Sequence, residues 1–378
     1  MKGKKITLFN QVSGPLFIDI ANVYLEKYEE VILVTGDIEP TYAQLDDKIK
    51  VIRKVKYKRN KAYLRIGTWL IFYLQCYFYL LYNKEHGRVL FVTNPPILPF
   101  LGVVFSKKRE LNFSVLIYDI YPDALSNFGY VKPDSFLYTF WGKMNKNSYK
   151  LASEVITISS VMKKVIARSV EEDKIKVIFP WVDTSFIKPL KKNENWFVEK
   201  HGLINKKVIL YSGNMGLTHD LMTLMESAKE LKKIENNFHF LFIGGGTQKE
   251  SLQNFKEKHD LTNVSFLPYQ EPEVLPFSFA SADFGIVSLG SGAEALSVPS
   301  KTFYLLSAGA VIVAITESGS EIESLINENN CGLSIQPKDN NKLIQFLLNS
   351  EEKDINVNKF NSRALSKKFT KENAKQFL

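Results

Sequence analysis

The chain has 378 residues, of which 45% are apolar, 24% are charged and 13% are aromatic. This composition excludes a disordered or fibrous protein, and the length predicts about two domains, since a single core rarely grows to this size. The two cysteines, Cys76 and Cys331, form no metal or redox motif, and the opening sequence MKGKKITLFN has no leader-like apolar run. Both features favour a reducing, cytoplasmic setting.

The net charge of +9 is carried by the first half of the chain. All of the excess Lys and Arg lies within residues 1–190, and no acidic residue occurs between Lys48 and Lys84. This asymmetry indicates that the first half faces something polyanionic, for which nucleic acid and an anionic membrane both qualify. Aromatic residues are packed into one apolar run instead of being interleaved with bases, which argues against nucleic acid.

Strands and helices alternate along the first half. Near-continuous apolar strands are predicted at 4–9, 30–36, 88–96, 113–123, 154–160 and 174–183. Helices are predicted at 16–27, 135–152 and 161–169. Apolar strands separated by helices indicate a parallel sheet covered on both faces, which is a Rossmann-like domain.

One segment of this half has an unusual composition. Residues 53–65 carry seven bases and lead into 66–83, which carry no charge but include four tyrosines. A spanning helix is normally richer in Leu, Ile and Val, so a transmembrane helix is disfavoured. Two interpretations stay open: a core helix beside a solvated loop, or a partly buried helix whose basic and aromatic edge rests on a bilayer. The second interpretation predicts membrane-facing roles for Lys54, Lys56, Lys58, Arg59 and Trp69.

The α/β pattern restarts after a charged, proline-containing linker near residue 188. Strands are predicted at 206–212, 238–244, 263–269, 282–289 and 310–315, with helices at 219–233 and 247–258. We therefore expect two Rossmann-like domains, 1–188 and 189–360, followed by a helix over 361–378 that returns toward the first domain. Ligands bind such sheets at the carboxyl ends of the strands, which predicts a site in an interdomain cleft.

The first candidate loop of the second half is YSGNMGLTHD, residues 211–220. Gly213, Asn214 and Gly216 follow a strand and precede a helix, where backbone N–H groups can meet a phosphate. The tight turn that every βα unit needs explains the same glycines, and on this loop alone it is the better explanation.

The second loop, IGGGTQKESL, places Gly244 and Gly245 at a strand end and Lys249 in the first turn of the next helix. A cation there would meet a diphosphate, or would be a solvated lysine. Neither this loop nor the first contains GxGxxG, which argues against a nicotinamide or flavin site.

Two later loops complete the predicted site. Pro268 and Tyr269 are candidates to border a flat nucleobase. In SLGSGAEALSVPSK, Glu294 is a candidate to hold sugar hydroxyls, and Ser300 and Lys301 stand near the start of a helix. Each of these residues is also compatible with an ordinary solvated loop.

The ordered motifs YSGNMG, FIGGGTQKESL, VSFLPY, ASADFGIVSL, VPSKTFYLLSAGAVIVA and GSEIESLINENNCGL resemble the donor-binding half of group 1, family-four glycosyltransferases. VIFPWVDTSFIKP resembles the interdomain segment of that family. YDIYPDAL resembles a loop of its bacterial surface-polysaccharide members, including the fucosaminyltransferase-like branch. The resemblance extends from about Lys5 to Leu378.

The resemblance implies a GT-B fold, a nucleotide-sugar donor in the second domain and retention of anomeric configuration, with no cofactor and no metal. It implies a UDP donor carrying an N-acetylated or 6-deoxy hexose, and a polyprenyl-diphosphate-linked acceptor. The expected setting is capsule, O-antigen or exopolysaccharide synthesis, on the cytoplasmic face of the inner membrane and without nucleic acid. Gly14, in SGP, matches the family's glycine loop near the donor phosphates.

Two carboxylates of the first domain are candidates for catalysis. Asp119 and Asp123 end the predicted strand 113–123, and either could orient or deprotonate the acceptor hydroxyl, with Asp123 favoured. A strand-end turn would explain Asp119 equally well. The retaining mechanism needs no protein nucleophile if the leaving phosphate takes the acceptor proton.

The chain departs from the family pattern at two places. The family's paired glutamates would fall at Leu296 and Tyr304, so Glu294 and the PSK motif are expected to take over part of their role. The usual base after the first glycine loop is missing, and Asn214 and His219 are the nearest residues. Two alternatives stay open: a nucleotide-sugar 2-epimerase of the same fold, and an inactive GT-B scaffold at the membrane.

Overall fold

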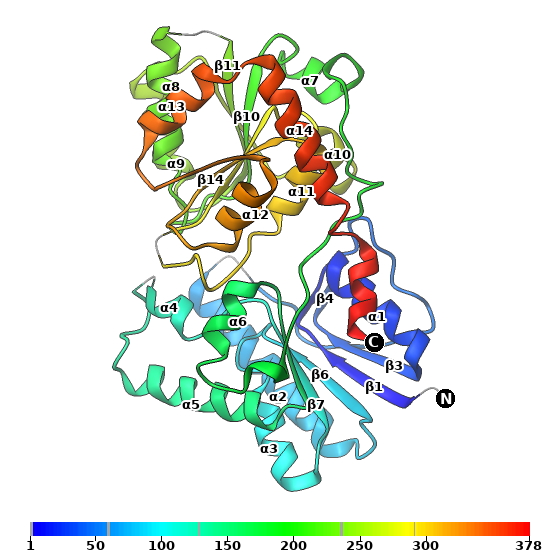
Figure 1. Ribbon diagram of the computed structural model, residues 1–378. Coiled ribbons are helices and arrows are strands. Elements are labelled where there is room, and N and C mark those ends of the chain that lie inside the picture. Colours follow the sequence, from blue (N-terminus) through cyan, green and yellow to red (C-terminus); the bar gives the residue numbers. More distant parts are fainter. Residues whose placement is uncertain (1–2, 59–60, 128, 235–236, 291) are drawn as a thin grey trace. The chain divides into compact units, whose positions relative to one another are not determined.

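Figure 1 shows the chain as a computed structural model with two compact units. The structure describes residues 3–58, 61–127, 129–234, 237–290 and 292–378. The first unit contains Met1–Pro180 and Lys371–Leu378, and the second contains Trp181–Thr370. The division thus falls after Pro180 and not at residue 188. The residues at the end of the chain that join the first unit are 371–378 and not 361–378.

The first unit is built on a parallel seven-stranded sheet with the order β5-β3-β1-β6-β7-β8-β9. Its strands are β1 (Gly3–Phe9), β3 (Tyr28–Thr35), β5 (Lys50–Arg53), β6 (Arg88–Val92), β7 (Phe113–Ile117), β8 (Glu154–Thr157) and β9 (Ile175–Val177). A short parallel pair, β2 (Val12–Ser13) and β4 (Asp37–Ile38), stands apart from it. The helices are α1 (Pro15–Lys27), α2 (Ala62–Tyr82), α3 (Phe100–Arg109), α4 (Asp123–Asn127), α5 (Phe136–Leu151) and α6 (Ser160–Ile166), with 3-10 turns η1 (Glu172–Lys174) and η4 (Lys371–Phe377). Strands buried on both faces explain their near-continuous apolar sequences.

The second unit has a parallel six-stranded sheet with the order β12-β11-β10-β13-β14-β15. Its strands are β10 (Lys207–Asn214), β11 (Phe238–Gly245), β12 (Val264–Leu267), β13 (Phe284–Ser288), β14 (Val311–Ile315) and β15 (Gly332–Ile335). The helices are α7 (Trp196–Lys200), α8 (Met222–Ile234), α9 (Lys249–Lys258), α10 (Leu275–Phe279), α11 (Lys301–Ala308), α12 (Glu321–Asn329), α13 (Asn340–Asn349) and α14 (Glu352–Ser366), with 3-10 turns η2 (Lys192–Glu194) and η3 (Pro272–Val274). Both sheets confirm the predicted pair of Rossmann-like halves.

Several strands are shorter than the apolar runs predicted. Strand β7 ends at Ile117, because the next N–H, of Tyr118, donates to the hydroxyl of Thr93 instead of to a neighbouring strand. Asp119 and Asp123 therefore lie beyond the strand, in the following loop and at the first residue of α4. Strand β5 was missed because its sequence is rich in bases and it lies at the sheet edge, where only one neighbour pairs with it.

Helix α2 presents two opposite apolar stripes. Phe72, Cys76 and Leu80 are fully buried against the first unit. A second row, offset by two positions and hence by about 200° around the helix, is about half exposed or more. This row consists of Ile66, Leu70, Leu74, Phe78 and Tyr82.

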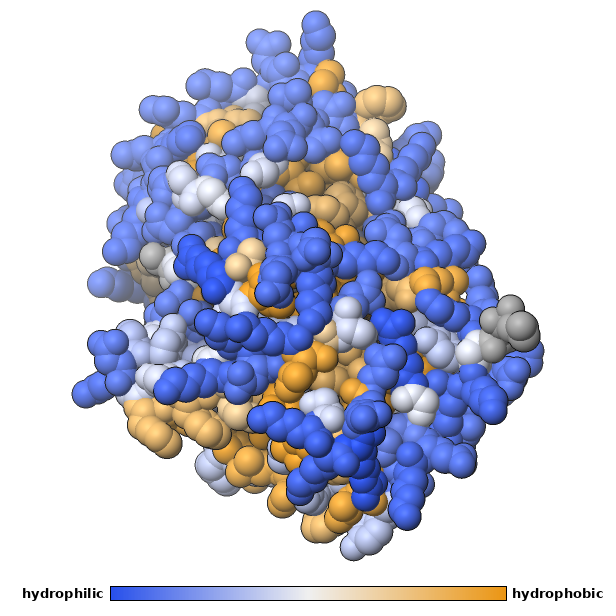
Figure 2. All heavy atoms as spheres, turned by 60° about the horizontal axis from the view of Figure 1, so that its bottom comes forward, coloured by the Kyte–Doolittle hydropathy of each residue, from blue (hydrophilic) through white to orange (hydrophobic). Residues whose placement is uncertain are grey.

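Figure 2 brings this side of the first unit forward and shows hydrophobic side chains gathered on it. Within the described ranges, Tyr63–Tyr82 is the one stretch long and apolar enough to cross a bilayer, by length and composition only. Because one stripe of α2 is buried in the fold, this helix belongs to the domain. The predicted packing of α2 on the core is confirmed, and α2 also exposes an apolar face. Contact of that face with a bilayer stays a prediction.

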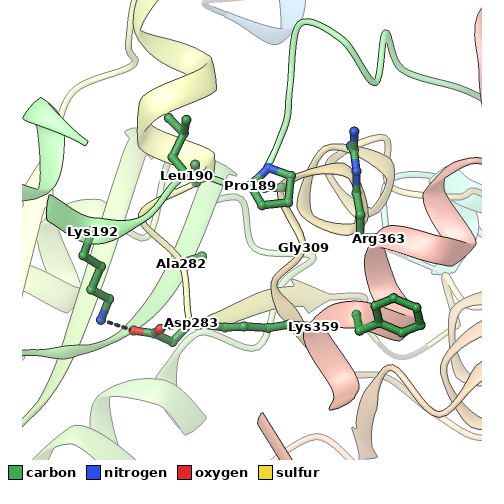
Figure 3. Close-up of a pocket in the computed structure, with 11 residues that line it drawn as sticks. Pro189, Leu190, Lys192, Ala282, Asp283, Gly309, Lys359 and Arg363 are labelled. Carbon is green, nitrogen blue, oxygen red and sulfur yellow. Dashed lines mark hydrogen bonds and ion pairs between the residues drawn. The ribbon is translucent and has the colours of Figure 1, made fainter. Parts of the chain in front are cut away.

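A buried carboxylate anchors the amino end of β13 (Figure 3). Asp283 is 7% exposed, and its oxygens accept from the ammonium of Lys192 at 2.5 Å, from that of Lys359 at 2.7 Å and from the N–H of Val208 at 2.8 Å. Burial by itself would raise the pKa of Asp283, but Lys359 and Lys192 together hold it below its usual value. The network joins the chain entering the second unit to β10, β13 and α14. It borders a cavity of about 290 Å³ that Pro189 and Arg363 also line.

We expect Asp283→Asn to lower the free energy of unfolding by about 3 kcal/mol at pH 7, because the neutral amide leaves two ammonium groups without their counter-charge. Urea unfolding followed by circular dichroism would measure the loss. Asp260→Asn is the matched control and should cost under about 0.5 kcal/mol, since the pair of Asp260 with Lys232 is solvent-exposed. Equal losses in the two variants would contradict the assignment.

The same pair of proteins gives a pH test. The pKa of Asp283 is lower in the folded than in the unfolded chain, so its contribution is fully present above the unfolded value and is lost as pH falls through the folded value. The stability difference between the wild-type protein and Asp283→Asn should therefore shrink in acid.

Candidate functional site

The turns after β10 and β11 meet through glycines. Gly213 and Gly244 lie opposite each other in the strand register, with φ of 140° and 131°. A Cβ atom on Gly244 would lie 2.1 Å from the carbonyl oxygen of Gly213, so only glycine fits there. The N–H of Met215 donates to the carbonyl of Gly245 at 2.7 Å and joins the two turns. The two glycine loops of the sequence therefore form one continuous surface, at the carboxyl edge of the sheet.

The sequence predicted that the first of these turns leads directly into a helix, but it does not. Helix α8 begins at Met222, and the carboxylate of Asp220 caps it by accepting from the N–H of Thr223 at 3.3 Å. Gly216 belongs to the loop before that cap, and exposed Asn214 is the last residue of β10. Because the carboxylate of Asp220 already occupies this terminus, the start of α8 offers little positive charge to an anion.

Lys301 places an ammonium group beside the first glycine turn. It is the first residue of α11, and its ammonium lies over the ring of Tyr211, 3.9 Å from the ring centroid. A Cβ atom on Gly213 would be 2.9 Å from the Lys301 nitrogen, so the ammonium sits against the first glycine turn. Its Nζ is buried and has no hydrogen-bond partner. Burial lowers the pKa of this ammonium to about 7, because the charged form has lost its hydration.

His219 does not replace the base that is missing from the first loop. Burial, and then the charge of Lys301, lower the pKa of its imidazole to about 4, so it is neutral at physiological pH. Its Nδ1 lies 2.7 Å from the carbonyl oxygen of Ser288, which fixes the ring against the end of β13. The imidazole therefore lies near Lys301 without adding charge.

Tyr269 and Lys249 border the same surface. A Cβ atom on Gly244 would lie 3.3 Å from the Tyr269 ring, and one on Gly245 would lie 3.5 Å from it. The Tyr269 side chain is 61% exposed, so one flat face remains open beside Pro268. The ammonium of Lys249 donates to the carbonyl of Gly244 at 3.3 Å. These sequence-predicted residues thus gather around the paired glycine turns.

Glu294 lies in the loop between β13 and α11. Its Oε2 is buried and has no hydrogen-bond partner. The positions of the family's paired glutamates hold apolar contacts instead: Leu296 is buried and Tyr304 stacks on Phe279 with centroids 5.2 Å apart. Ser300 precedes α11 without a side-chain capping bond. Among the described residues of these loops, Glu294 and Lys301 carry the two buried charged groups that lack partners.

The first unit places its candidate residues at the carboxyl edge of its own sheet. Gly14 caps α1 with open space around it, because a Cβ atom there would have no neighbour within 4 Å. Burial raises the pKa of the Asp119 carboxyl to about 6, and the carboxylate of Asp123 accepts from the hydroxyl of Tyr138 at 2.9 Å. The sequence reasoning missed Asn10, whose side-chain amide is buried without a partner just after β1. A polar residue directly after an apolar strand was the available signal.

The predicted basic residues lie beside α2. Lys54 lies over the ring of Tyr79 with 5.9 Å to the centroid, and Lys56 pairs with Asp37 at 3.4 Å. Lys58 is exposed, and Arg59 lies outside the described residues. Trp69 stacks on Tyr57, with centroids 6.2 Å apart.

Comparison with known proteins places this geometry in a family. The signature described as "Glycosyl transferases group 1" matches residues 194–364, which contain all four loops of the second unit. The probable glycosyltransferase WbjE of Pseudomonas aeruginosa is 26% identical over 255 residues, covering 66% of this chain and 62% of that protein. The putative colanic acid biosynthesis glycosyl transferase WcaI of Escherichia coli K12 is 32% identical over 121 residues, covering 32% of this chain and 29% of that protein.

Solved structures share the architecture. Anabaena Alr3699/HepE, crystallised in complex with UDP-glucose, superposes with a TM-score of 0.75 at 15% identity, covering 98% of this chain and 97% of that chain. At this identity the superposition establishes the fold, while the signature matches residues 194–364. Residues 194–364 thus resemble the group 1 glycosyl transferases in sequence, and the chain has the GT-B fold.

Proposed function

We propose that the protein is a retaining glycosyltransferase that moves a sugar from a UDP-sugar to a polyprenyl-diphosphate-linked acceptor. The observation that carries this proposal is the ammonium of Lys301, which is buried against a glycine turn without any partner. An unpaired buried cation is costly for the folded protein, so its retention indicates an anionic ligand. A nucleoside diphosphate matches that charge.

The donor's diphosphate would lie on the paired glycine turns, between Lys301 and Lys249. Absence of side chains at Gly213 and Gly244 lets phosphate oxygens approach the backbone. The open ring face of Tyr269 suits a uracil base, and the UDP-glucose complex of the similarly folded HepE supports a uridine donor. Glu294, with one oxygen buried and unpartnered, would accept hydrogen bonds from the hydroxyls of the sugar or ribose.

The chemistry needs one broken bond and one formed bond at the same carbon. The bond from the sugar's C1 to the diphosphate oxygen breaks, and the acceptor oxygen forms its bond to C1 on the face that the diphosphate leaves. The acceptor proton passes to the departing diphosphate, so no protein nucleophile is required. Lys301 and Lys249 stabilise the negative charge that grows on the diphosphate, in the role that a metal ion serves in other enzymes. We propose that the reaction needs no metal and no cofactor.

The acceptor would be held by the first unit. Asp119, with its raised pKa, and Asp123 are the proposed groups that orient the acceptor hydroxyl. The bases beside α2 and its exposed apolar stripe suit the cytoplasmic face of an anionic inner membrane. The name of WcaI includes colanic acid biosynthesis, which supports a role in a bacterial surface polysaccharide such as capsule, O-antigen or exopolysaccharide. An N-acetylated or 6-deoxy hexose is the sugar we propose.

Lys301→Met separates stability from function. We expect the dissociation constant for UDP to rise about 10- to 100-fold, because a charge-assisted contact with the diphosphate is lost. The variant should also be more stable at pH 7, by about 1–3 kcal/mol, because Met carries no charge that must be buried. Calorimetric titration and urea unfolding measure the two effects.

The sign of the stability change follows from the pKa. The pKa of Lys301 is lower in the folded than in the unfolded chain, so its cost is present in full below about pH 7 and disappears as pH rises toward 10.5. The gain from Lys301→Met should vanish over that range. The exposed Lys258→Met is the control and should change neither UDP binding nor stability. Unaltered UDP affinity in Lys301→Met would mean that the phosphates lie elsewhere.

UDP binding should also depend on pH. Between pH 7 and 9 the free protein loses the Lys301 proton, while bound diphosphate holds it, so the dissociation constant should rise by up to about tenfold per pH unit. Neighbouring His219 and Tyr211 do not titrate there, because burial lowers the pKa of the first and raises that of the second well beyond this range. In Lys301→Arg the side chain stays charged, so the dissociation constant for UDP should not change with pH and its profile should be flat. A wild-type profile that is equally flat would contradict the proposal.

Membrane attachment is tested separately. Replacing Lys54, Lys56 and Lys58 by Gln should reduce co-sedimentation with anionic vesicles, by about tenfold, because each base near the surface contributes on the order of 1 kcal/mol that salt screens in part. The control is a variant of the second unit in which Gln replaces Lys229, Lys232 and Lys233. Unchanged sedimentation of the first variant would refute the basic surface and leave the transferase proposal intact.

A further inference from the structure

The first unit contains an apolar cavity of about 460 Å³ that the proposed reaction does not use. Trp69 and Leu70 of α2, Phe100 of α3, and Leu137 and Trp141 of α5 line it. The volume falls within the range of small-molecule sites, about 300–1,000 Å³. Among its lining residues a single one, Arg65, is charged. A cavity of this composition fits an apolar chain that ends in one anionic group.

Three hydrogen-bond donors of the cavity wall have no acceptor. Nε of Arg65 and the indole Nε1 atoms of Trp69 and Trp141 are all buried without a partner. Buried indole N–H groups normally find an acceptor, and leaving three donors unsatisfied is costly. The guanidinium also lies 5.8 Å from the Trp69 ring centroid, so it is held close to one of these indoles. Oxygens of a bound anion would supply the acceptors that these groups lack.

The cavity is joined to the acceptor edge of the sheet by aromatic contacts. The ring of Tyr121 stacks on Trp141 with centroids 5.9 Å apart, and meets Trp69 edge-on at 6.4 Å. Tyr121 stands between Asp119 and Asp123 in the sequence, in the loop that follows β7. A ligand whose anionic group reaches this wall therefore lies close to the two proposed acceptor carboxylates.

The cavity opens among exposed apolar side chains. Ile66 and Leu70 of α2 are each 51% exposed, Phe140 of α5 is 48% exposed, and Tyr130 is 65% exposed. All four residues also line the cavity. Their exposed area forms a path of apolar surface to the cavity, and the bases beside α2 add positive charge near it. An occupant that comes from an anionic bilayer matches both features.

We propose that this cavity binds the first isoprene units of the lipid-linked acceptor, with its phosphate oxygens at Arg65 and at the indoles of Trp69 and Trp141. The inference rests on the proposed function and deepens it by naming the site of the acceptor lipid. The cavity is too small for a whole polyprenyl tail, so the remaining units stay in the bilayer beside the exposed stripe of α2. The phosphate at Arg65 then holds the sugar toward Asp119 and Asp123.

Soluble probes test the site on the full chain without membranes or detergent. Calorimetric titration compares farnesyl diphosphate with farnesol, which has the tail alone, and with inorganic diphosphate, which has the charge alone. We expect farnesyl diphosphate to bind at least tenfold more tightly than either. In Arg65→Gln its affinity should fall about tenfold while that of farnesol is unchanged. Equal affinity of farnesyl diphosphate for the wild-type protein and Arg65→Gln would overturn the placement of the phosphate.

Two residues of the exposed stripe make a matched pair. Leu70 lines the cavity and Leu74, one turn further along α2, does not, although the two are 51% and 52% exposed. Because both side chains are about half exposed, Leu70→Glu and Leu74→Glu should both fold, and both should weaken binding to vesicles. Leu70→Glu alone should weaken the binding of farnesyl diphosphate at least tenfold, because it places a carboxylate at the cavity. Equal effects of the two variants on the soluble probe would overturn the cavity as its site.

Two further measurements separate the possible failures. UDP affinity is measured in every variant and should stay unchanged, since the donor loops belong to the other unit. UDP binding without any preference for the prenyl probe would refute the lipid site and leave the transferase intact, whereas absence of UDP binding would refute the proposed function itself. Light scattering is measured on the wild-type protein and on both Glu variants. A dimer that both substitutions dissociate would assign the apolar face to a second copy of the chain and overturn the proposal.

Discussion

The donor half of the molecule depends on one ammonium group that is removed from water without receiving an anion. Lys301 reaches the glycine turns because it begins α11, directly beyond the loop that follows β13. Its neighbours there are the Tyr211 ring, the backbone at Gly213 and a neutral imidazole. None of them neutralises the charge, so burial lowers the pKa of this ammonium to about 7.

The buried charges near the two ends of β13 differ in the partners that the protein gives them. At the amino end, Asp283 has two lysines and a backbone N–H within hydrogen-bond distance, and its pKa is held low. At the carboxyl end, Ser288 leads into the loop and helix that present Lys301 with no counter-ion. The first arrangement is complete within the protein and serves the fold. The second has no partner within the protein, which is the observation on which the proposed binding site rests.

The sequence predicted those parts of the molecule that arise from local patterns. Continuous apolar runs predicted both parallel sheets, and Gly213, Gly244 and Lys301 were identified from their place after strands and before helices. Helix α8 was placed too early because Asp220 was not recognised as a cap, although an Asp three residues before Thr223 is a usual signal. Arg65 could not be found in this way, and the place of Asn10 after β1 could not show that its amide lacks a partner, because the absence of a partner depends on the packing of segments distant in sequence.

Helix α2 explains why the composition of the first half was ambiguous. A helix that packs on a soluble core normally has one apolar stripe, and a spanning helix is apolar all round. Here the stripe through Phe72 is filled by the core and the opposite stripe through Leu70 is not. Length and hydropathy cannot distinguish this pattern from a membrane span, because they average over the circumference. The division of the helix into two faces, with bases on the strand and loop before it, supports the proposal of an apolar partner on the outside as well as the one within the fold. Under that proposal the basic charge of the first half and the polar chemistry of the second correspond to different ligands, a lipid and a nucleotide.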